Sequence, residues 1–132
     1  MENAWHKNQL VYIASPLRGN IRINLANAAQ YCEAAVHADV IPLAPHLYFS
    51  TFLDDLKPAD RMKGMAMGIR LLSRCDALWV FGEPTEGVRA EILFAETHHI
   101  PIMYFQPEVC ERIIAGDLTA ISRELCAKTE KH

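Results

Sequence analysis

The sequence lacks the features that mark several common classes of protein. It has no run of Lys and Arg, and its formal net charge is -3, so it offers no general attraction for nucleic acid. No apolar run approaches the ~20 residues of a membrane-spanning helix, and residues 1–7 lack the apolar stretch of a signal peptide. We therefore expect no nucleic-acid partner, no membrane partner and a cytoplasmic location.

The sequence also lacks the paired ligands of a metal site. Its four cysteines are widely spaced and form no C-x-x-C pair: Cys32, Cys75, Cys110 and Cys126. Structural zinc sites usually pair their ligands at short spacing. His98 and His99 are adjacent, and neighbouring positions of a helix point about 100° apart, so they cannot chelate one ion together. We expect reduced thiols, no metal and no cofactor.

Strand and helix patterns alternate along the 132 residues, a length that suits one domain spanning residues 1–132. Short apolar runs predict strands at residues 10–14, 40–44, 77–81 and 102–105. Helical spacing predicts helices at residues 21–38, 59–74 and 87–99, and a helical tail at 107–128 with a break near Gly116. The core of the domain is expected over about residues 10–105.

This alternation predicts an α/β fold, a three-layer sandwich with a mainly parallel sheet of the flavodoxin-like or Rossmann-like kind. Pro42 favours an edge position for the second strand, and the unbroken apolar run 77–81 favours a central position for the third. Ligands of such sheets bind beyond the carboxyl ends of the strands, where the strand order reverses. With the order 2-1-3-4, the turns after the first and third strands would face one crevice.

The turn at residues 15–20 follows the first strand and opens a helix, so free backbone N–H groups and a positive dipole end point beyond it. Ser15, Arg18 and Gly19 would complete a cradle for a phosphate or carboxylate. In the second turn Thr85 is a natural N-cap residue whose hydroxyl can also bind phosphate, and Gly87 leaves room for a ligand. The alternative is a pair of ordinary turns with Arg18 solvated.

Glu91 lies one turn into the helix that follows the second of these turns. Val88, Ile92, Ala95 and His99 form the stripe expected to pack on the sheet, and Glu91 lies about 60° from its middle, at the edge of the buried face. Its side chain leans toward Gly87 and the crevice. A half-buried carboxylate there is a candidate nucleophile or general base, and the alternative is a boundary Glu paired with an Arg.

Three further residues stand near the same strand ends. Tyr12 is expected in the core, with a hydroxyl that could reach the upper edge of the sheet. His46 follows the second strand and is a candidate ligand-binding residue, although a structural role is the common one for a lone His. Asp76 precedes the third strand and is expected to be structural.

Four segments together resemble the nucleoside 2-deoxyribosyltransferase superfamily, near the deoxynucleoside 5′-monophosphate N-glycosidases. They are VYIASPLRG at 11–19, PLAPH at 42–46, CDALWVFG at 75–82, and Thr85-x-Gly87-x-x-x-Glu91. The resemblance implies that Glu91 attacks the anomeric carbon of a 2-deoxyribose, that Thr85 and Arg18 hold a 5′-phosphate, and that the protein is a homo-oligomer whose partner is a small deoxynucleotide.

The chain departs from this family at Gly68, where the family usually carries an Asp. The proton for the leaving base then has no assigned donor, and the candidates are Asp54, Asp55, Asp60 and Glu86. The expected function is cleavage or transfer at the N-glycosidic bond of a 2-deoxyribonucleotide through a covalent sugar–Glu intermediate. The alternatives are a nucleotide-binding module without efficient catalysis and, with less support, a flavin-binding flavodoxin.

Overall fold

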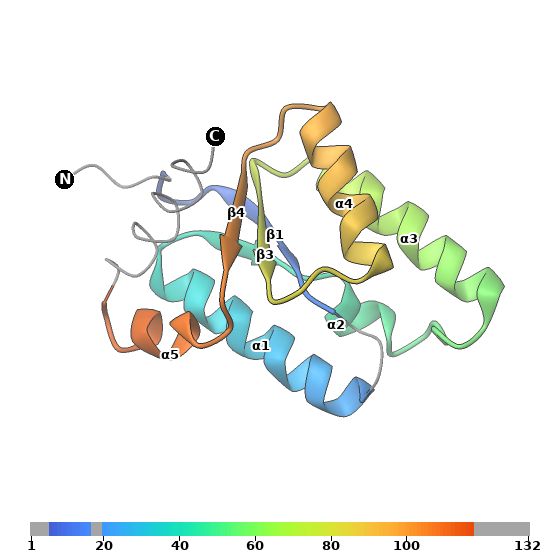
Figure 1. Ribbon diagram of the computed structural model, residues 1–132, viewed down its shortest axis with the longest axis horizontal. Helices are drawn as coiled ribbons and strands as arrows, with labels where there is room; N and C mark the ends of the chain where they lie inside the picture. Colours follow the sequence, from blue (N-terminus) through green and yellow to red (C-terminus); the bar gives the residue numbers. More distant parts are fainter. Residues whose placement is uncertain (1–5, 17–19, 118–132) are drawn as a thin grey trace.

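The computed structural model describes residues 6–16 and 20–117, which form a parallel sheet between two layers of helices (Figure 1). The strands are β1 (Leu10–Ala14), β2 (Ile41–Leu43), β3 (Ala77–Phe81) and β4 (Ile102–Phe105), in the order β2-β1-β3-β4 with every pairing parallel. The α/β fold class and the predicted strand order are confirmed. No helix in the described part of the chain is long and apolar enough to span a membrane.

The positions of the strands follow from their sequences. β3 is central and buried at all five positions, which suits its continuous apolar run. β2 lies at the edge and pairs only with β1, so Pro42 costs no hydrogen bond on the open side. The Asp76 carboxylate ties the two central strands together, because Oδ2 accepts from the Leu10 N–H at 2.8 Å while the Asp76 N–H donates to the Leu10 carbonyl at 2.7 Å. The structural role expected of Asp76 is confirmed.

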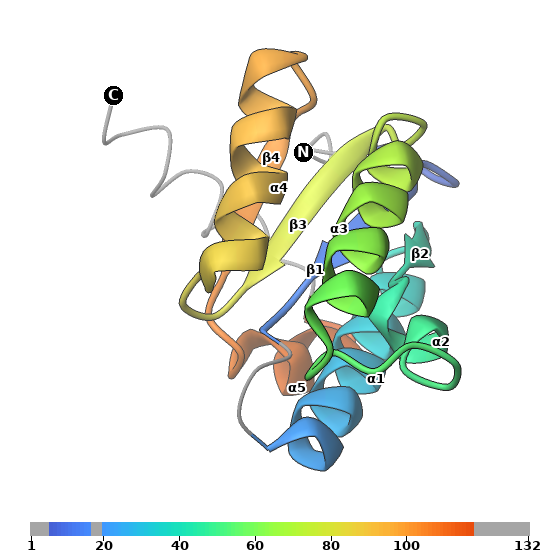
Figure 2. The ribbon, with the colours of Figure 1, turned by 90° about the vertical axis from the view of Figure 1, so that its right-hand side faces the viewer.

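One face of the sheet is covered by α1 (Ile21–His37) and α5 (Val109–Ile114), as Figure 2 shows. Asn20 caps α1 by accepting from the Ile23 N–H at 3.1 Å. The core on this face is apolar and rich in aromatic rings. Tyr31 stacks on Phe81 with ring centroids 4.3 Å apart, and Phe105 lies 5.0 Å from Phe81.

The other face is covered by α3 (Pro58–Leu72) and α4 (Glu86–Thr97) (Figure 2). Pro58 occupies the first turn of α3, where a missing N–H costs nothing. The core beneath these helices consists of smaller side chains, among them Leu72, Leu78, Val80, Val88 and Ala95. This is the face that carries the cavities described below.

Two details of the helices differ from the expectations, and a third agrees with them. The short helix α2 (His46–Phe49) was not predicted, because four residues are too few for a helical period to show. α4 ends at Thr97, and His99 is exposed with φ 58°, so it does not belong to the stripe that packs on the sheet. α5 ends before Gly116, whose φ of 99° confirms the predicted break, and the tail from 118 onward lies outside the described residues.

Candidate functional site

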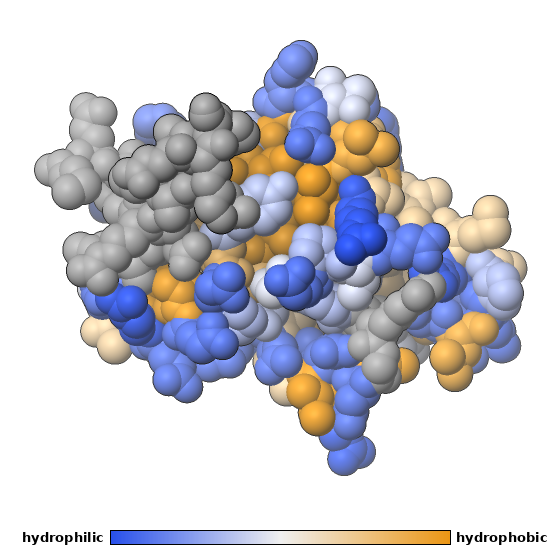
Figure 3. Space-filling model, in the orientation of Figure 1, coloured by the Kyte–Doolittle hydropathy of each residue, from blue (hydrophilic) through white to orange (hydrophobic). Residues whose placement is uncertain are grey.

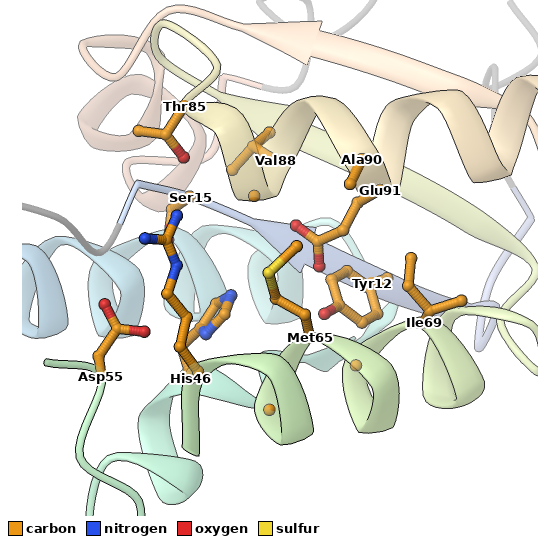
Figure 4. A pocket seen from close by; sticks show the side chains of 14 residues that line it. Tyr12, Ser15, His46, Asp55, Met65, Ile69, Thr85, Val88, Ala90 and Glu91 are labelled. Atoms are coloured by element: carbon orange, nitrogen blue, oxygen red, sulfur yellow. The ribbon is translucent and has the colours of Figure 1, made fainter. Parts of the chain in front are cut away.

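Six of the eight residues predicted to form the site line one cavity at the carboxyl ends of β1 and β3. They are Tyr12, Ser15, His46, Thr85, Gly87 and Glu91. The other two, Arg18 and Gly19, lie outside the described residues. Figure 4 shows Thr85 and Ser15 at one end of the cavity, with Glu91 and Tyr12 toward the other. The strand order therefore brings together side chains from segments far apart in the sequence, as expected at a switch point.

Glu91 is buried more deeply than its place in the sequence predicted. It is 6% exposed, and its carboxylate points toward Tyr12 in the cavity (Figure 4). Burial raises the pKa of Glu91 from 4.5 to about 7, because the charged form loses its hydration, and the nearby Tyr12 hydroxyl opposes this rise. Glu91 Oε1 has no hydrogen-bond partner among the described residues, and no Arg among them pairs with the carboxylate. Within the described part of the chain, Glu91 is therefore not a boundary residue paired with an Arg.

Tyr12 is fully buried in the middle of β1, as expected, and its hydroxyl faces the Glu91 carboxylate. The hydroxyl has no hydrogen-bond partner among the described residues. Burial raises the pKa of Tyr12 well above 10.0, and the Glu91 charge raises it further. The phenol therefore stays protonated and can donate to a carboxylate or to a ligand. Two unsatisfied buried polar groups facing one cavity are costly unless a ligand or water satisfies them.

Gly68 of α3 is the third member of this cluster. A Cβ at this position would lie 2.9 Å from Tyr12 Oη and 4.0 Å from Glu91 Oε2. The Tyr12 hydroxyl therefore occupies the space into which any larger residue at position 68 would extend. An Asp there could be accommodated only if Tyr12 moved, which gives a steric account of the Gly at this position.

Thr85 and Gly87 lie where α4 begins. Thr85 has the backbone position of the N-cap, but its hydroxyl makes no capping hydrogen bond, so a purely capping role for this side chain is wrong. Nothing lies within 4 Å of a Cβ built on Gly87. The Thr85 hydroxyl and the first N–H groups of α4 are thus oriented toward an open part of the cavity, a suitable place for an anion.

Ser15 and His46 line the cavity beside Thr85 and Asp55 (Figure 4). Ser15 directly follows β1 and is buried. His46 begins α2; its burial lowers the pKa of the imidazole, and the charge of Asp55 opposes that shift. A neutral imidazole at pH 7 can both donate and accept a hydrogen bond.

The helix α3 forms part of the cavity wall, which was not predicted from the sequence. Arg61, Gly64, Met65, Gly68 and Ile69 all line the cavity. Steps of three and four residues along the helix place them on one face. The two small residues at 64 and 68 were the available signal, because a helix face that carries Gly at this spacing leaves room beside it.

Of the four acids considered as proton donors, Asp55 alone lines the cavity that contains Glu91. Asp60 Oδ2 accepts from the Asp54 N–H at 2.9 Å, and Asp54 Oδ1 accepts from the Leu56 N–H at 3.0 Å, so these two acids shape the loop before α3. Glu86 forms an ion pair with Arg61. An adjoining cavity of about 310 Å³ is lined by Phe49, Leu53 and all three aspartates.

No three His, Cys, Asp or Glu side chains within residues 6–16 and 20–117 come together as a metal site requires. Cys32, Cys75 and Cys110 are free thiols, and Cys126 lies outside the described residues. Burial raises the pKa of the Cys75 and Cys110 thiols to about 12, so neither is a reactive thiolate at neutral pH.

Comparisons with known proteins identify a matching family model and similar solved structures. A family model described as a domain of unknown function (DUF7768) matches residues 9–105. No curated protein sequence is significantly similar to the chain. Among solved structures, a 2-deoxyribosyltransferase from the psychrotolerant bacterium Bacillus psychrosaccharolyticus superposes with a TM-score of 0.60 at 14% identity, over 74% of this chain and 72% of that one. At this identity the similarity establishes a shared fold.

Proposed function

The chain belongs to the DUF7768 family, and we propose that it cleaves or transfers at the N-glycosidic bond of a 2-deoxyribonucleotide, with Glu91 as nucleophile. The observation that carries this proposal is the buried Glu91 carboxylate at the switch point of the sheet, which faces a cavity and whose Oε1 has no hydrogen-bond partner among the described residues. Such a group destabilises the fold, so its presence favours a role in binding or chemistry. The shared fold with a 2-deoxyribosyltransferase supports the same activity class.

In the proposed reaction, a Glu91 carboxylate oxygen attacks the anomeric carbon of the sugar while the bond from that carbon to the base nitrogen breaks. The base leaves with the bonding electron pair and takes up a proton, and the sugar remains as an ester on Glu91. Water or a second base then attacks the same carbon and releases the carboxylate. With a pKa of about 7, Glu91 is partly ionised at neutral pH and poorly solvated, which suits a nucleophile.

The remaining residues take supporting roles in this proposal. The Tyr12 hydroxyl faces the Glu91 carboxylate and serves to orient it. Ser15, Arg18, Gly19, Thr85 and Gly87 hold the 5′-phosphate, and His46 contacts the substrate. Asp55 supplies the proton to the leaving base, because it lines the cavity that contains Glu91. Asp55 also lines the larger adjoining cavity, which has room for the base.

A homo-oligomer forms part of the same proposal. Phe52, Leu56 and Met62 lie in or beside the loop before α3 with more than half of their surface exposed, at 62%, 84% and 72%. Leu56 and Met62 also line a third cavity, next to the first. Large apolar side chains exposed together favour contact with another protein surface. Light scattering of the purified protein measures the assembly directly.

The activity is tested by incubating the protein with the four deoxynucleoside 5′-monophosphates and measuring free base by chromatography. We expect base release by the wild-type chain and none by Glu91→Gln, with ribonucleotides reacting poorly. Glu96→Gln is the matched control, because Glu96 is exposed on the same helix. Base release that persists in Glu91→Gln would contradict the assignment of the nucleophile.

The second candidate function is a nucleotide-binding module without efficient catalysis. Gly68 favours it, because this position offers no carboxyl group beside the cavity and has no room for one. General-acid help is typically worth about 10²–10⁴-fold, so its loss alone would make turnover slow. Tight nucleotide binding without base release from any of the four monophosphates over long incubation would establish this second function instead.

A further inference from the structure

Arg61 lies in the first turn of α3, where the Glu91 cavity meets its two neighbours. Its side chain lines all three cavities and is 29% exposed. Within residues 6–16 and 20–117 it is the only Lys or Arg that lines any of them. The same cavities carry Asp54, Asp55 and Asp60, so a negatively charged ligand would need a cation here.

The partner of Arg61 is weakly held. Arg61 Nη2 lies 3.5 Å from Glu86 Oε2, and the Glu86 side chain is 75% exposed. An ion pair of this length with one largely exposed partner contributes little to stability. A phosphate offers a guanidinium two parallel hydrogen bonds, which are shorter and stronger than this single contact. An anion entering the cavity can therefore take Arg61 from Glu86 at small cost.

Other groups facing the same cavity also favour an anion near Arg61. The Thr85 hydroxyl, unused for capping, and the first N–H groups of α4 border the cavity, and Glu86 is the first residue of that helix. Glu91, which is 6% exposed and whose Oε1 has no hydrogen-bond partner within the described part of the chain, lines the same space, and this marks the cavity as a ligand site rather than a packing defect. A phosphate between α3 and α4 would thus be held from both helices.

We propose that Arg61 is a specificity-determining residue that exchanges Glu86 for the 5′-phosphate of the substrate and so selects nucleotides over nucleosides. The proposal rests on the proposed function, because it assigns the charged group of the same substrate. It adds a cation from α3 to the site, and it gives Glu86 the role of a competitor that holds Arg61 until an anion arrives.

The test is calorimetric binding of the four deoxynucleoside 5′-monophosphates and the four matching deoxynucleosides, in a Glu91→Gln background that prevents turnover. Arg61→Ala should weaken monophosphate binding by about tenfold or more, the loss expected for a charge-assisted hydrogen bond, and change nucleoside binding less than about twofold. Arg61→Lys should bind monophosphates with an affinity between those of the parent chain and Arg61→Ala. Arg70→Ala, on an exposed part of α3 that lines none of these cavities, should change neither.

Glu86→Gln should tighten monophosphate binding by about two- to fivefold, because it removes the competitor for Arg61. In the Arg61→Ala background that gain should shrink, which a double-mutant cycle measures. The same gain in both backgrounds would overturn the exchange, since Glu86 would then act only by general repulsion. Thermal unfolding of each variant confirms that it is folded.

Two further results would overturn the role of Arg61: Arg61→Ala leaving monophosphate affinity unchanged, or weakening monophosphates and nucleosides equally. Absence of binding by any of the four monophosphates would do the same. The outcome is separable from that of the proposed function. If wild type releases no base but Arg61→Ala loses monophosphate binding selectively, the inference stands and the enzyme assignment fails. If base is released while Arg61 has no effect on selectivity, only the inference fails.

Discussion

The two faces of the sheet differ in what they bury. Against α1 and α5 the sheet presents Val11, Ile13, Trp79, Phe81 and Phe105, which form a continuous apolar and aromatic core. Against α3 and α4 the same strands present Tyr12, Leu78 and Val80 beside Gly68 and Glu91, and here cavities remain. Figure 3, in the orientation of Figure 1, shows apolar surface in the upper part of the molecule, among polar side chains.

The strand β1 contributes side chains both to the packed core on one face and to the cavity on the other. Side chains alternate along β1, so Val11 and Ile13 stabilise the α1 face while Tyr12 between them reaches Glu91 on the α4 face. Tight packing on one side supplies folding free energy. The other side retains buried polar groups that weaken the fold. The substitutions that follow test this division between the faces, and those expected to change the free energy of unfolding most come first.

Phe105→Ala tests the packed face. Phe105 is buried, with its ring centroid 5.0 Å from those of both Trp79 and Phe81, so truncation should lower the free energy of unfolding by about 3–5 kcal/mol. Urea denaturation measures the loss. Leu93→Ala is the control on an exposed apolar side chain and should change stability by about 0.5 kcal/mol or less. Below its Tm the Phe105 variant should keep its nucleotide affinity, and lost affinity would contradict the separation of the faces.

Glu91→Gln tests the cavity face through pH. Burial raises the pKa of Glu91 from its ordinary value of 4.5 to about 7 in the folded protein, so between these pH values the folded state holds a proton that the unfolded chain has lost. The contribution of the Glu91 proton to the free energy of unfolding is complete below pH 4.5. It is lost as the pH rises through 7, by about 3 kcal/mol in total. The variant should lack this loss, and Glu96→Gln should keep it. Equal pH slopes in wild type and Glu91→Gln would contradict the buried carboxylate.

Gly68→Ala tests the space beside Tyr12. The new methyl group would lie 2.9 Å from Tyr12 Oη, and the forced shift should cost about 1–3 kcal/mol of stability. Tyr12→Phe in the same chain should recover part of that loss, because it removes the atom in contact. The control is Gly64→Ala on the same helix, where the nearest atom is 3.5 Å away and a gain of about 0.4–1 kcal/mol is expected. Equal effects at the two glycines would contradict the steric account.

Tyr12→Phe alone should have the smallest effect on stability. It removes a buried hydroxyl that has no hydrogen-bond partner among the residues that the structure describes, so the free energy of unfolding should change by about 1 kcal/mol or less and can rise. The hydroxyl lowers the pKa of Glu91, so its removal should raise that pKa and move the pH midpoint of base release upward. A midpoint that is unchanged or lower would show that Tyr12 does not act on Glu91.

Much of the fold was predictable because its signals are local. The strands at 10–14, 77–81 and 102–105 were predicted with the bounds that the structure gives them, since short apolar runs bounded by turns mark buried strands. Helix α2 was missed because it contains a single turn. The meeting of the turns after β1 and β3 at one edge of the sheet followed from the predicted strand order. The contact of Gly68 with Tyr12 did not, because it depends on how α3 packs on the sheet.

The most direct test of Glu91 as the nucleophile is a rapid-quench experiment in which the protein is mixed with a deoxynucleoside 5′-monophosphate, denatured and analysed by peptide mass spectrometry. We predict a mass increase equal to the deoxyribose phosphate on the peptide that contains Glu91, transient in wild type and absent from Glu91→Gln. Base release without such an adduct at any quench time, or an adduct on another residue, would contradict the account.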